Sequence, residues 1–175
     1  MKHTGKSRHG FTLADGLRRD FCDTDTIIRE IDEAQHGSRR TVRDIYLEDG
    51  AERFRQLETA ACRLIAAREE PLVVATGGGL CDNQEALEST RGYLLVHIVD
   101  TYEAIAERVF TRGIPAFLRT KDERIARERF RELYDRRIGI YDSIAHLRVE
   151  INGRPLRSAG ALVAATITEY LNGRQ

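Results

Sequence analysis

Two short, uninterrupted apolar runs place the tightest limits on how this chain can fold. Leu72-Val73-Val74-Ala75 is one run, and the segment from Tyr93 to Val99 contains the other. A strand that is apolar at nearly every position is typical of a parallel sheet, because helices cover both of its faces. Apolar runs and stretches with helical periodicity alternate along the chain. We therefore predict an α/β fold in which helices flank a parallel sheet.

The remaining pattern divides into expected helices, strands and one loop. An apolar stripe of helical spacing runs through residues 51–68 and consists of Phe54, Leu57, Ala61, Leu64 and Ile65. Other expected helices cover 7–17, 25–33, 41–47, 101–110, 122–143 (with a break near Gly139) and 158–172. Further strands are expected to end at 21–22 and to cover 147–151, and 111–121 is expected to be a loop. We expect the 175 residues to form a single domain.

Composition excludes several classes of function. The 28 basic and 28 acidic residues give a net charge of zero, so no overall field attracts nucleic acid or an anionic membrane. No apolar run approaches the ~20 residues that span a bilayer, and the N-terminus lacks the apolar segment of a signal peptide. Cys22, Cys62 and Cys81 lack metal-ligand spacing and fit reduced thiols. We expect a cytoplasmic monomer without nucleic-acid or membrane partners.

Gly5-Lys6-Ser7 stands directly before the first expected helix. It matches the second half of the phosphate loop, Gly-x-x-x-x-Gly-Lys-Ser/Thr. In that loop backbone N–H groups bind phosphate oxygens, the lysine reaches the β/γ-phosphates and the hydroxyl ligates magnesium. We assign Gly5, Lys6, Ser7 and the following Arg8 to nucleotide binding. A tripeptide of this kind also occurs by chance, so the assignment depends on the motifs downstream.

The phosphate loop is cut at its start. Its first glycine would fall one position before Met1, and the strand that normally precedes the loop is missing from the sequence. Because that strand lies in the middle of the sheet, its loss would leave neighbouring strand edges unpaired. Either the reading frame is assigned too short, which we expect, or the protein is degenerate and catalytically impaired.

Asp23-Thr24-Asp25 follows the strand that is expected to end at 21–22. In an extended segment, a spacing of two points both carboxylates the same way. Asp23 could then bind magnesium, while Asp25 could accept the proton of an attacking hydroxyl or orient it. The alternative is that Asp23 or Thr24 caps the helix that begins near residue 25, which is compatible with the same functional role.

Thr76-Gly77-Gly78-Gly79 follows the strand at 72–75. Consecutive glycines cost backbone entropy, so they suit a turn where a ligand touches the main chain or where φ must be positive. Ligands of open α/β sheets bind beyond the carboxyl ends of the strands, where this turn lies. An ordinary flexible turn is the alternative.

Taken in this order, the motifs resemble those of shikimate kinase. The family carries Gly-Lys-Ser, then Asp-x-Asp, then Phe-Arg within a helix, then three glycines, and here Phe54-Arg55-Gln56-Leu57-Glu58 supplies the third motif. The resemblance extends from Met1 to about Leu171. It implies a three-layer kinase fold of the P-loop type. It also implies phosphorylation of the 3-hydroxyl of shikimate by ATP, with magnesium, in aromatic amino-acid biosynthesis.

The resemblance also implies roles for single residues. Lys6 would hold the ATP phosphates, Ser7 and Asp23 would hold magnesium, and Asp25 would bind shikimate hydroxyls. Arg55, and Arg137 four residues before Tyr141, would bind the shikimate carboxylate, since guanidinium forks suit planar carboxylates. Gly77, Gly78 and Gly79 would touch the ring hydroxyls, Asn152 would lie near the adenine, and 25–68 would form the substrate-binding helices. For either arginine, an exposed helix surface is the alternative.

The expected lid, 111–121, departs from the family. Where the family places an arginine before a proline, this chain has Ile114 before Pro115, and an aliphatic side chain cannot stabilise phosphoryl charge. We expect Arg112 to take over the catalytic and nucleotide contacts, with Arg119 as the other candidate. Arg8 also departs, since the family has a small hydroxyl residue there.

Two other functions remain open at this stage. A different small-metabolite kinase, such as a gluconate kinase, would share the phosphate loop and the aspartate pair. A nucleotide-binding pseudokinase would fit the cut loop and Ile114.

Overall fold

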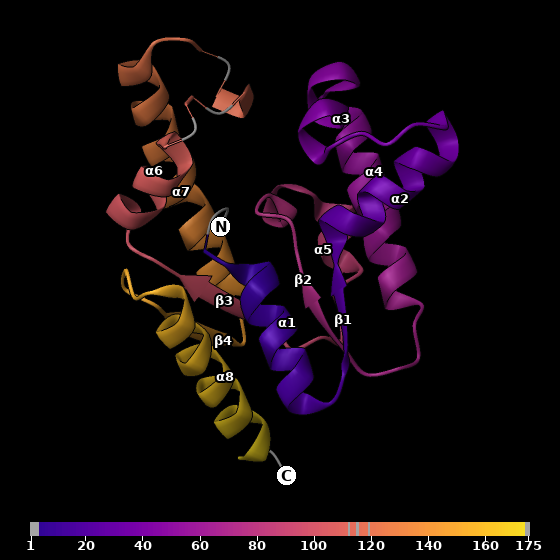
Figure 1. The fold of residues 1–175 in the computed structure, drawn as a ribbon, viewed down its shortest axis with the longest axis vertical. Coiled ribbons are helices and arrows are strands. Elements are labelled where there is room, and N and C mark those ends of the chain that lie inside the picture. Colours follow the sequence, from indigo (N-terminus) through magenta and orange to yellow (C-terminus); the bar gives the residue numbers. More distant parts are fainter. Residues whose placement is uncertain (1–3, 112, 115, 119, 174–175) are drawn as a thin grey trace. The chain divides into compact units, whose positions relative to one another are not determined.

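A computed structural model describes residues 4–111, 113–114, 116–118 and 120–173 (Figure 1). The chain divides into two compact units. Unit 1 comprises residues 1–13 and 94–175, and unit 2 comprises residues 14–93.

Unit 2 is built on two parallel strands. β1 (Asp20–Asp23) pairs with β2 (Leu72–Ala75), with Phe21 opposite Val73 and Asp23 opposite Ala75. The crossover between them contains α2 (Thr24–His36), α3 (Val42–Glu48) and α4 (Gly50–Ala66). A short 3₁₀ helix (Leu80–Asp82) and α5 (Gln84–Glu88) follow β2. Because the strands are parallel and in register, their carboxyl ends lie together at one edge.

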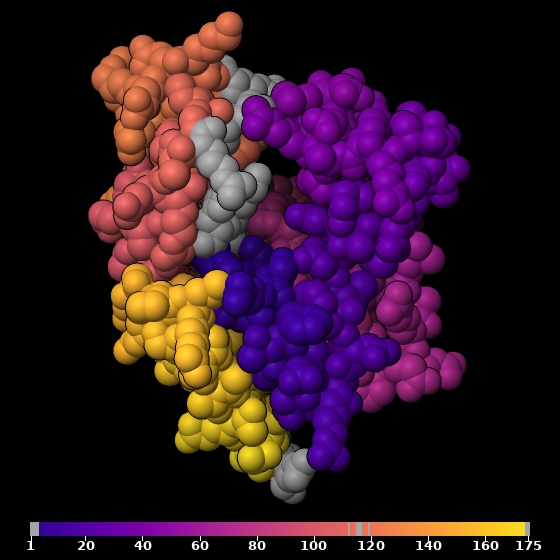
Figure 2. Space-filling view, in the orientation of Figure 1, coloured from indigo at the N-terminus to yellow at the C-terminus, as the bar shows by residue number. Residues whose placement is uncertain are grey.

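The core of unit 2 forms where α2 and α3 pack against α4. Ile28, Ile45, Leu57 and Ala61 are essentially inaccessible to solvent, and burying a side chain as large as Ile or Leu stabilises a fold by roughly 1.5–3 kcal/mol. The outer side of α3 lies at the surface in the space-filling view, where residues 42–48 are purple (Figure 2). The helix predicted for 51–68 is confirmed as α4, and Leu57, Ala61 and Ile65 of its predicted stripe are buried, whereas Leu64 is 57% exposed.

Unit 1 contains the second parallel pair. β3 (Val96–Val99) pairs with β4 (Leu147–Glu150), and the first turns of α1 (Lys6–Leu17) belong to this unit. The connection from β3 to β4 contains α6 (Tyr102–Phe110), a short 3₁₀ helix (Ala116–Leu118) and α7 (Glu123–Ile144). α8 (Leu156–Asn172) ends the described chain and packs against β4 (Figure 1).

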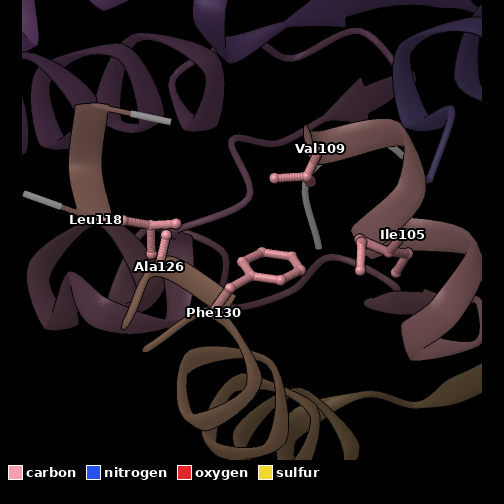
Figure 3. Close-up of a cluster of buried hydrophobic side chains, with 6 residues drawn as sticks. Ile105, Val109, Leu118, Ala126 and Phe130 are labelled. Atoms are coloured by element: carbon pink, nitrogen blue, oxygen red, sulfur yellow. The ribbon is translucent and has the colours of Figure 1, made fainter. Parts of the chain in front are cut away.

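Phe130 of α7 lies at the centre of the main apolar cluster in unit 1 (Figure 3). Ile105 and Val109 of α6 approach its ring from one side, and Leu118 and Ala126 lie on the other. All five side chains are buried. The cluster therefore packs Leu118 against side chains of α6 and α7.

The α/β pattern and the parallel strands are confirmed, while several details of the prediction are wrong. α7 is a continuous helix of 22 residues through Gly139, so the expected break is absent. The expected strand at 93–99 begins only at Val96, because residues 89–93 form turns that precede it. Among the described residues, β1 pairs with β2 and β3 pairs with β4 in two separate sheets. The single domain over 1–175 stays a prediction.

None of the helices in the described ranges combines the length and the apolar content that crossing a bilayer would require.

Candidate functional site

The phosphate loop opens with a left-handed glycine. Gly5 has φ +78°, and α1 begins at the next residue, Lys6. The carbonyl of Gly5 accepts the first helical hydrogen bond from the N–H of His9, at 2.9 Å. Lys6 is half-buried, whereas Ser7 and Arg8 are exposed. The four assigned nucleotide-binding residues thus lie on one helical N-terminus, where the first N–H groups have no helical acceptor and can bind an anion.

His9 lies directly beneath this loop, a feature that the sequence prediction missed. Its imidazole is 3% exposed and sits between two glycines. A Cβ atom at Gly5 would lie 2.8 Å from Nε2 of His9, and one at Gly160 of α8 would lie 3.2 Å from its Nδ1. Burial lowers the pKa of His9, opposed by a hydrogen bond with the backbone of Thr4. The neutral ring therefore fills the space under the phosphate loop.

Asn152 stands at the tip of the connection between β4 and α8. Its φ of +45° is left-handed, and Gly153 follows with φ +68°. The N–H of Gly153 donates to Oδ1 of Asp100 at 2.6 Å, while Arg108 donates to Oδ2 of the same carboxylate at 2.5 Å. Asp100 is buried at the end of β3. The connection that carries Asn152 is therefore anchored to the carboxyl end of the neighbouring strand, and its contact with adenine stays a prediction.

The aspartate pair in unit 2 does not form one extended segment. Asp23 is extended, and its Oδ1 accepts the N–H of Asp25 at 2.9 Å as the N-cap of α2. Asp25 lies in the first turn of that helix and is exposed. The capping alternative is confirmed for Asp23. The expectation that both carboxylates point the same way from a strand is wrong, because the helix begins between them.

The glycine turn contacts this segment directly. The N–H of Gly77 donates to Oγ1 of buried Thr24 at 2.9 Å. A Cβ atom at Gly77 would lie 3.0 Å from Oε1 of Glu58 and 3.5 Å from Oδ1 of Asp25. The φ values of Gly77 and of Gly79 (−111°) are not left-handed. Close approach of side chains, rather than positive φ, thus explains why Gly77 lacks a side chain.

Arg55 lies on α4, three residues before Glu58. Its guanidinium pairs with Glu52 at 2.6 Å and remains 47% exposed, and this hydrogen bond raises its pKa further. Glu58 lies one turn later and is 3% exposed. Both Thr24 and Glu58 stand inside motifs predicted from the sequence, Thr24 as a possible helix cap and Glu58 at the end of the motif that begins at Phe54. Neither residue was assigned a contact at the site.

Arg137 and the lid belong to unit 1. Arg137 is half-buried on α7, one turn before Tyr141. Ile114 packs against the apolar cluster around Phe130, so its side chain contributes to the hydrophobic core of unit 1. The predicted lid arginine, Arg112, and its alternative, Arg119, lie outside the described residues. The shared role of Arg55 and Arg137 stays a prediction, because the two residues lie in different units.

An acidic cluster in unit 2 resembles a metal site at first sight. Asp32, His36 and Asp49 offer ligand atoms within 4.8 Å of one another. However, Nη2 of Arg40 already lies 2.6 Å from Oδ1 of Asp32, 2.6 Å from Oδ2 of Asp49 and 3.3 Å from Nδ1 of His36. The guanidinium is thus the cation of this cluster, and we assign no metal to it.

A lysine and a serine at a helical N-terminus, with carboxylates and a glycine turn at the carboxyl ends of parallel strands, are the features of a small-molecule kinase. The shikimate kinase family model matches residues 3–171. A shikimate kinase of Desulforudis audaxviator is 36% identical over 167 residues, which cover 95% of this chain and 82% of that protein. One from Geobacter metallireducens is 34% identical over 173 residues, covering 98% and 88%.

Solved structures give the same result. A shikimate kinase from Acinetobacter baumannii in complex with shikimate has a TM-score of 0.76 at 25% identity, covering 97% of this chain and 88% of that one. The Aquifex aeolicus shikimate kinase has a TM-score of 0.73 at 27% identity, covering 99% and 94%. The chain belongs to the shikimate kinase family. It is accordingly a phosphotransferase with an alcohol acceptor that uses ATP. The expectation of a longer reading frame gains no support from these matches and stays a prediction.

Proposed function

We propose that this chain transfers the terminal phosphoryl group of ATP to the 3-hydroxyl of shikimate, that Lys6, Asp25 and Arg112 carry the reaction, and that Arg55 binds the acceptor. The single observation that supports the acceptor side best is the convergence of Asp25 and Glu58 at Gly77, beyond the carboxyl ends of β1 and β2. Hydroxyl groups of a small ring can hydrogen-bond to such carboxylates and to the glycine backbone.

The donor side rests on the N-terminus of α1. The amides that follow Gly5 and the ammonium group of Lys6 would neutralise the phosphate oxygens, which carry most of the charge in a loose phosphoryl-transfer transition state. Asn152 would lie near the base, and Arg8 and Arg112 would supply further positive charge. The residues of the protein thus act by positioning the substrates and by neutralising charge on the phosphate oxygens.

The acceptor side requires a proton acceptor and an anchor. Asp25 is exposed and can orient the attacking hydroxyl and accept its proton. Arg55, and Arg137 from unit 1, would bind the carboxylate of shikimate through guanidinium forks. Gly77, Gly78 and Gly79 would offer backbone contacts to the ring hydroxyls.

Ser7 and Asp23 are oxygen donors of the kind that magnesium prefers. Ser7 is exposed, and the helix cap formed by Asp23 uses Oδ1 of a carboxylate that has two oxygens. Both residues therefore fit a role as magnesium ligands. When bound, the ion would neutralise charge on the phosphate oxygens.

A substrate panel tests the proposal. Purified full-length chain is incubated with ATP and magnesium plus shikimate, gluconate or no acceptor, and the product is followed by phosphorus NMR and by ADP release. We expect ADP and one new phosphate monoester only with shikimate. Turnover with gluconate instead would identify another small-metabolite kinase. ATP binding by calorimetry without turnover on either acceptor would identify a pseudokinase. The monomeric state and the cytoplasmic location stay predictions, and gel filtration tests the first.

A further inference from the structure

The side-chain amide of Asn83 lies buried behind the candidate acceptor site in unit 2. Asn83 directly precedes α5 and is 5% exposed. It stands four residues after Gly79, the last glycine of the turn. It belongs to none of the motifs recognised in the sequence. Its surroundings join the glycine turn to the helix that carries Arg55.

This amide makes four hydrogen bonds within unit 2. Nδ2 donates to the carbonyl of Arg55 at 2.9 Å and to Oε2 of Glu58 at 3.0 Å. Oδ1 accepts from Oγ1 of Thr59 at 3.2 Å and from the N–H of Ala86 at 3.3 Å. An asparagine amide offers two donor hydrogens and two acceptor lone pairs. All four are therefore used.

The orientation of the amide is fixed by its backbone partners. The carbonyl of Arg55 can only accept and the N–H of Ala86 can only donate, so a flipped amide would oppose acceptor to acceptor and donor to donor. A buried polar network in which every member is paired is rigid, because any displacement leaves a group without a partner. Asn83 thus holds one turn of α4 at a fixed place relative to α5.

Nδ2 donates to two groups that belong to the proposed acceptor site. One is the backbone of Arg55 itself. The other is Glu58, whose second oxygen, Oε1, reaches the position where Gly77 lacks a side chain. Asn83 touches neither the exposed guanidinium of Arg55 nor Asp25 in any hydrogen bond described for it. It can act on the acceptor only through these neighbours.

We propose that Asn83 is a positioning residue for acceptor binding. Its side chain fixes the positions of the Arg55 backbone and of the Glu58 carboxylate relative to the glycine turn. The proposal rests on the proposed function, since it takes Arg55 and Gly77 as contacts of the acceptor. It predicts that losing the two Nδ2 donors weakens acceptor binding and leaves nucleotide binding unchanged.

Asn83 also caps α5, and this purely structural role must be separated from positioning. The cap is the bond from the N–H of Ala86 to Oδ1, and serine and aspartate keep an oxygen that can accept it. Both substitutions remove the Nδ2 donors. Asn83→Asp also places a carboxylate against Glu58, whereas Asn83→Ser adds no charge. If both variants bind the acceptor more weakly, the cause is therefore the loss of the Nδ2 donors and not the loss of the helix cap.

The experiment measures KM for shikimate, KM for ATP and kcat of the full-length chain and of both variants. Thr41→Ala serves as the matched control, because it removes an N-cap of α3 in the same unit without touching this network. We expect Asn83→Ser to raise the shikimate KM by about tenfold, the cost of two hydrogen bonds. We expect a larger rise for Asn83→Asp. The ATP KM should stay within about twofold of the wild-type value in every variant.

The outcomes separate the two proposals. If the wild-type chain forms ADP with shikimate and Asn83→Ser keeps the wild-type shikimate KM, the positioning role is wrong and the proposed function stands. Equal rises in the KM values for ATP and shikimate, or a shikimate KM raised equally by Thr41→Ala, would reduce Asn83 to a structural cap. If the wild-type chain never turns over shikimate, the proposed function fails and the positioning role fails with it. Thermal melts show whether each variant is folded; if Asn83→Asp does not fold, Asn83→Ser decides.

Discussion

The backbone N–H of Gly77 donates a hydrogen bond of 2.9 Å to Oγ1 of Thr24. Thr24 begins α2 directly after β1, and Gly77 follows β2. The two strands run parallel, so this bond ties together the two segments that leave their carboxyl ends. It holds the glycine turn beside Asp25, in the half of the candidate site that we propose binds the acceptor.

Gly77→Ala should damage this half of the site. The added Cβ would lie 3.0 Å from Oε1 of Glu58, so either the carboxylate or the turn must move, and overpacking of this kind costs about 1–3 kcal/mol. We expect a raised shikimate KM with an unchanged ATP KM. Gly139→Ala is the matched control, because nothing lies within 4 Å of a Cβ there. Unaltered kinetics of Gly77→Ala would show that the close approach is irrelevant to binding.

Arg55→Lys keeps the charge and removes the guanidinium fork. If Arg55 binds the shikimate carboxylate through two hydrogen bonds, the shikimate KM should rise about tenfold or more, since hydrogen bonds to charged groups are worth about 1.5–3 kcal/mol. Arg63→Lys on the same helix is the control, because Arg63 is 67% exposed and pairs only with Glu85 among its described contacts. Steady-state kinetics of both variants decide the matter. If the two variants change the shikimate KM equally, Arg55 is an exposed surface residue with no role in binding the carboxylate.

Gly160→Ala should disturb the phosphate loop from beneath. The new Cβ would lie 3.2 Å from Nδ1 of His9, and His9 in turn fills the space against Gly5. We expect a raised ATP KM, an unchanged shikimate KM and a loss of stability of about 1–3 kcal/mol. Adding His9→Ala to Gly160→Ala should restore part of the ATP affinity, because the clash disappears. Additive effects of the two substitutions would contradict the contact.

The ion pair of Arg40 with Asp32 predicts a pH dependence of stability. Hydrogen bonds from Arg40 hold the pKa of the buried Asp32 carboxyl below its ordinary value. A depressed carboxyl pKa contributes stability above the unfolded-state pKa of about 3.9, and that contribution is lost as the pH falls through the folded-state value. Asp32→Asn should therefore unfold at a lower denaturant concentration than the wild type near pH 7. The difference in free energy of unfolding between the two proteins should shrink below about pH 4. A difference that stays constant with pH would exclude the pair as its cause.

Local patterns were enough to predict most of the fold. The stripe from Phe54 to Ile65 predicts α4 because one face of a helix must be buried, and the run Leu72–Ala75 predicts β2 because both its faces are covered. The five-residue α5 was missed, since so short a helix carries no periodicity. The break expected at Gly139 is absent because a single glycine costs an exposed helix only about 1 kcal/mol.

The candidate site was predictable only where its residues form motifs. Lys6, Asp25 and Gly77 stand in recognisable triplets and Glu58 ends the motif that begins at Phe54, whereas Asn83 and His9 act through partners far away in sequence. The contact of Asn83 with Arg55 spans 28 residues, and the packing of His9 against Gly160 joins opposite ends of the chain. No local pattern encodes such pairs, so the structure was needed to find them.

Shikimate-dependent ADP release by the wild-type chain and by Asp25→Asn, measured side by side with ATP and magnesium, tests the central claim most directly. The amide of asparagine keeps the shape of Asp25 and cannot accept the hydroxyl proton, and Lys6→Ala removes the proposed phosphate contact in the same assay. The account predicts turnover by the wild-type chain and its loss in both variants. Near-normal turnover by Asp25→Asn would contradict the account.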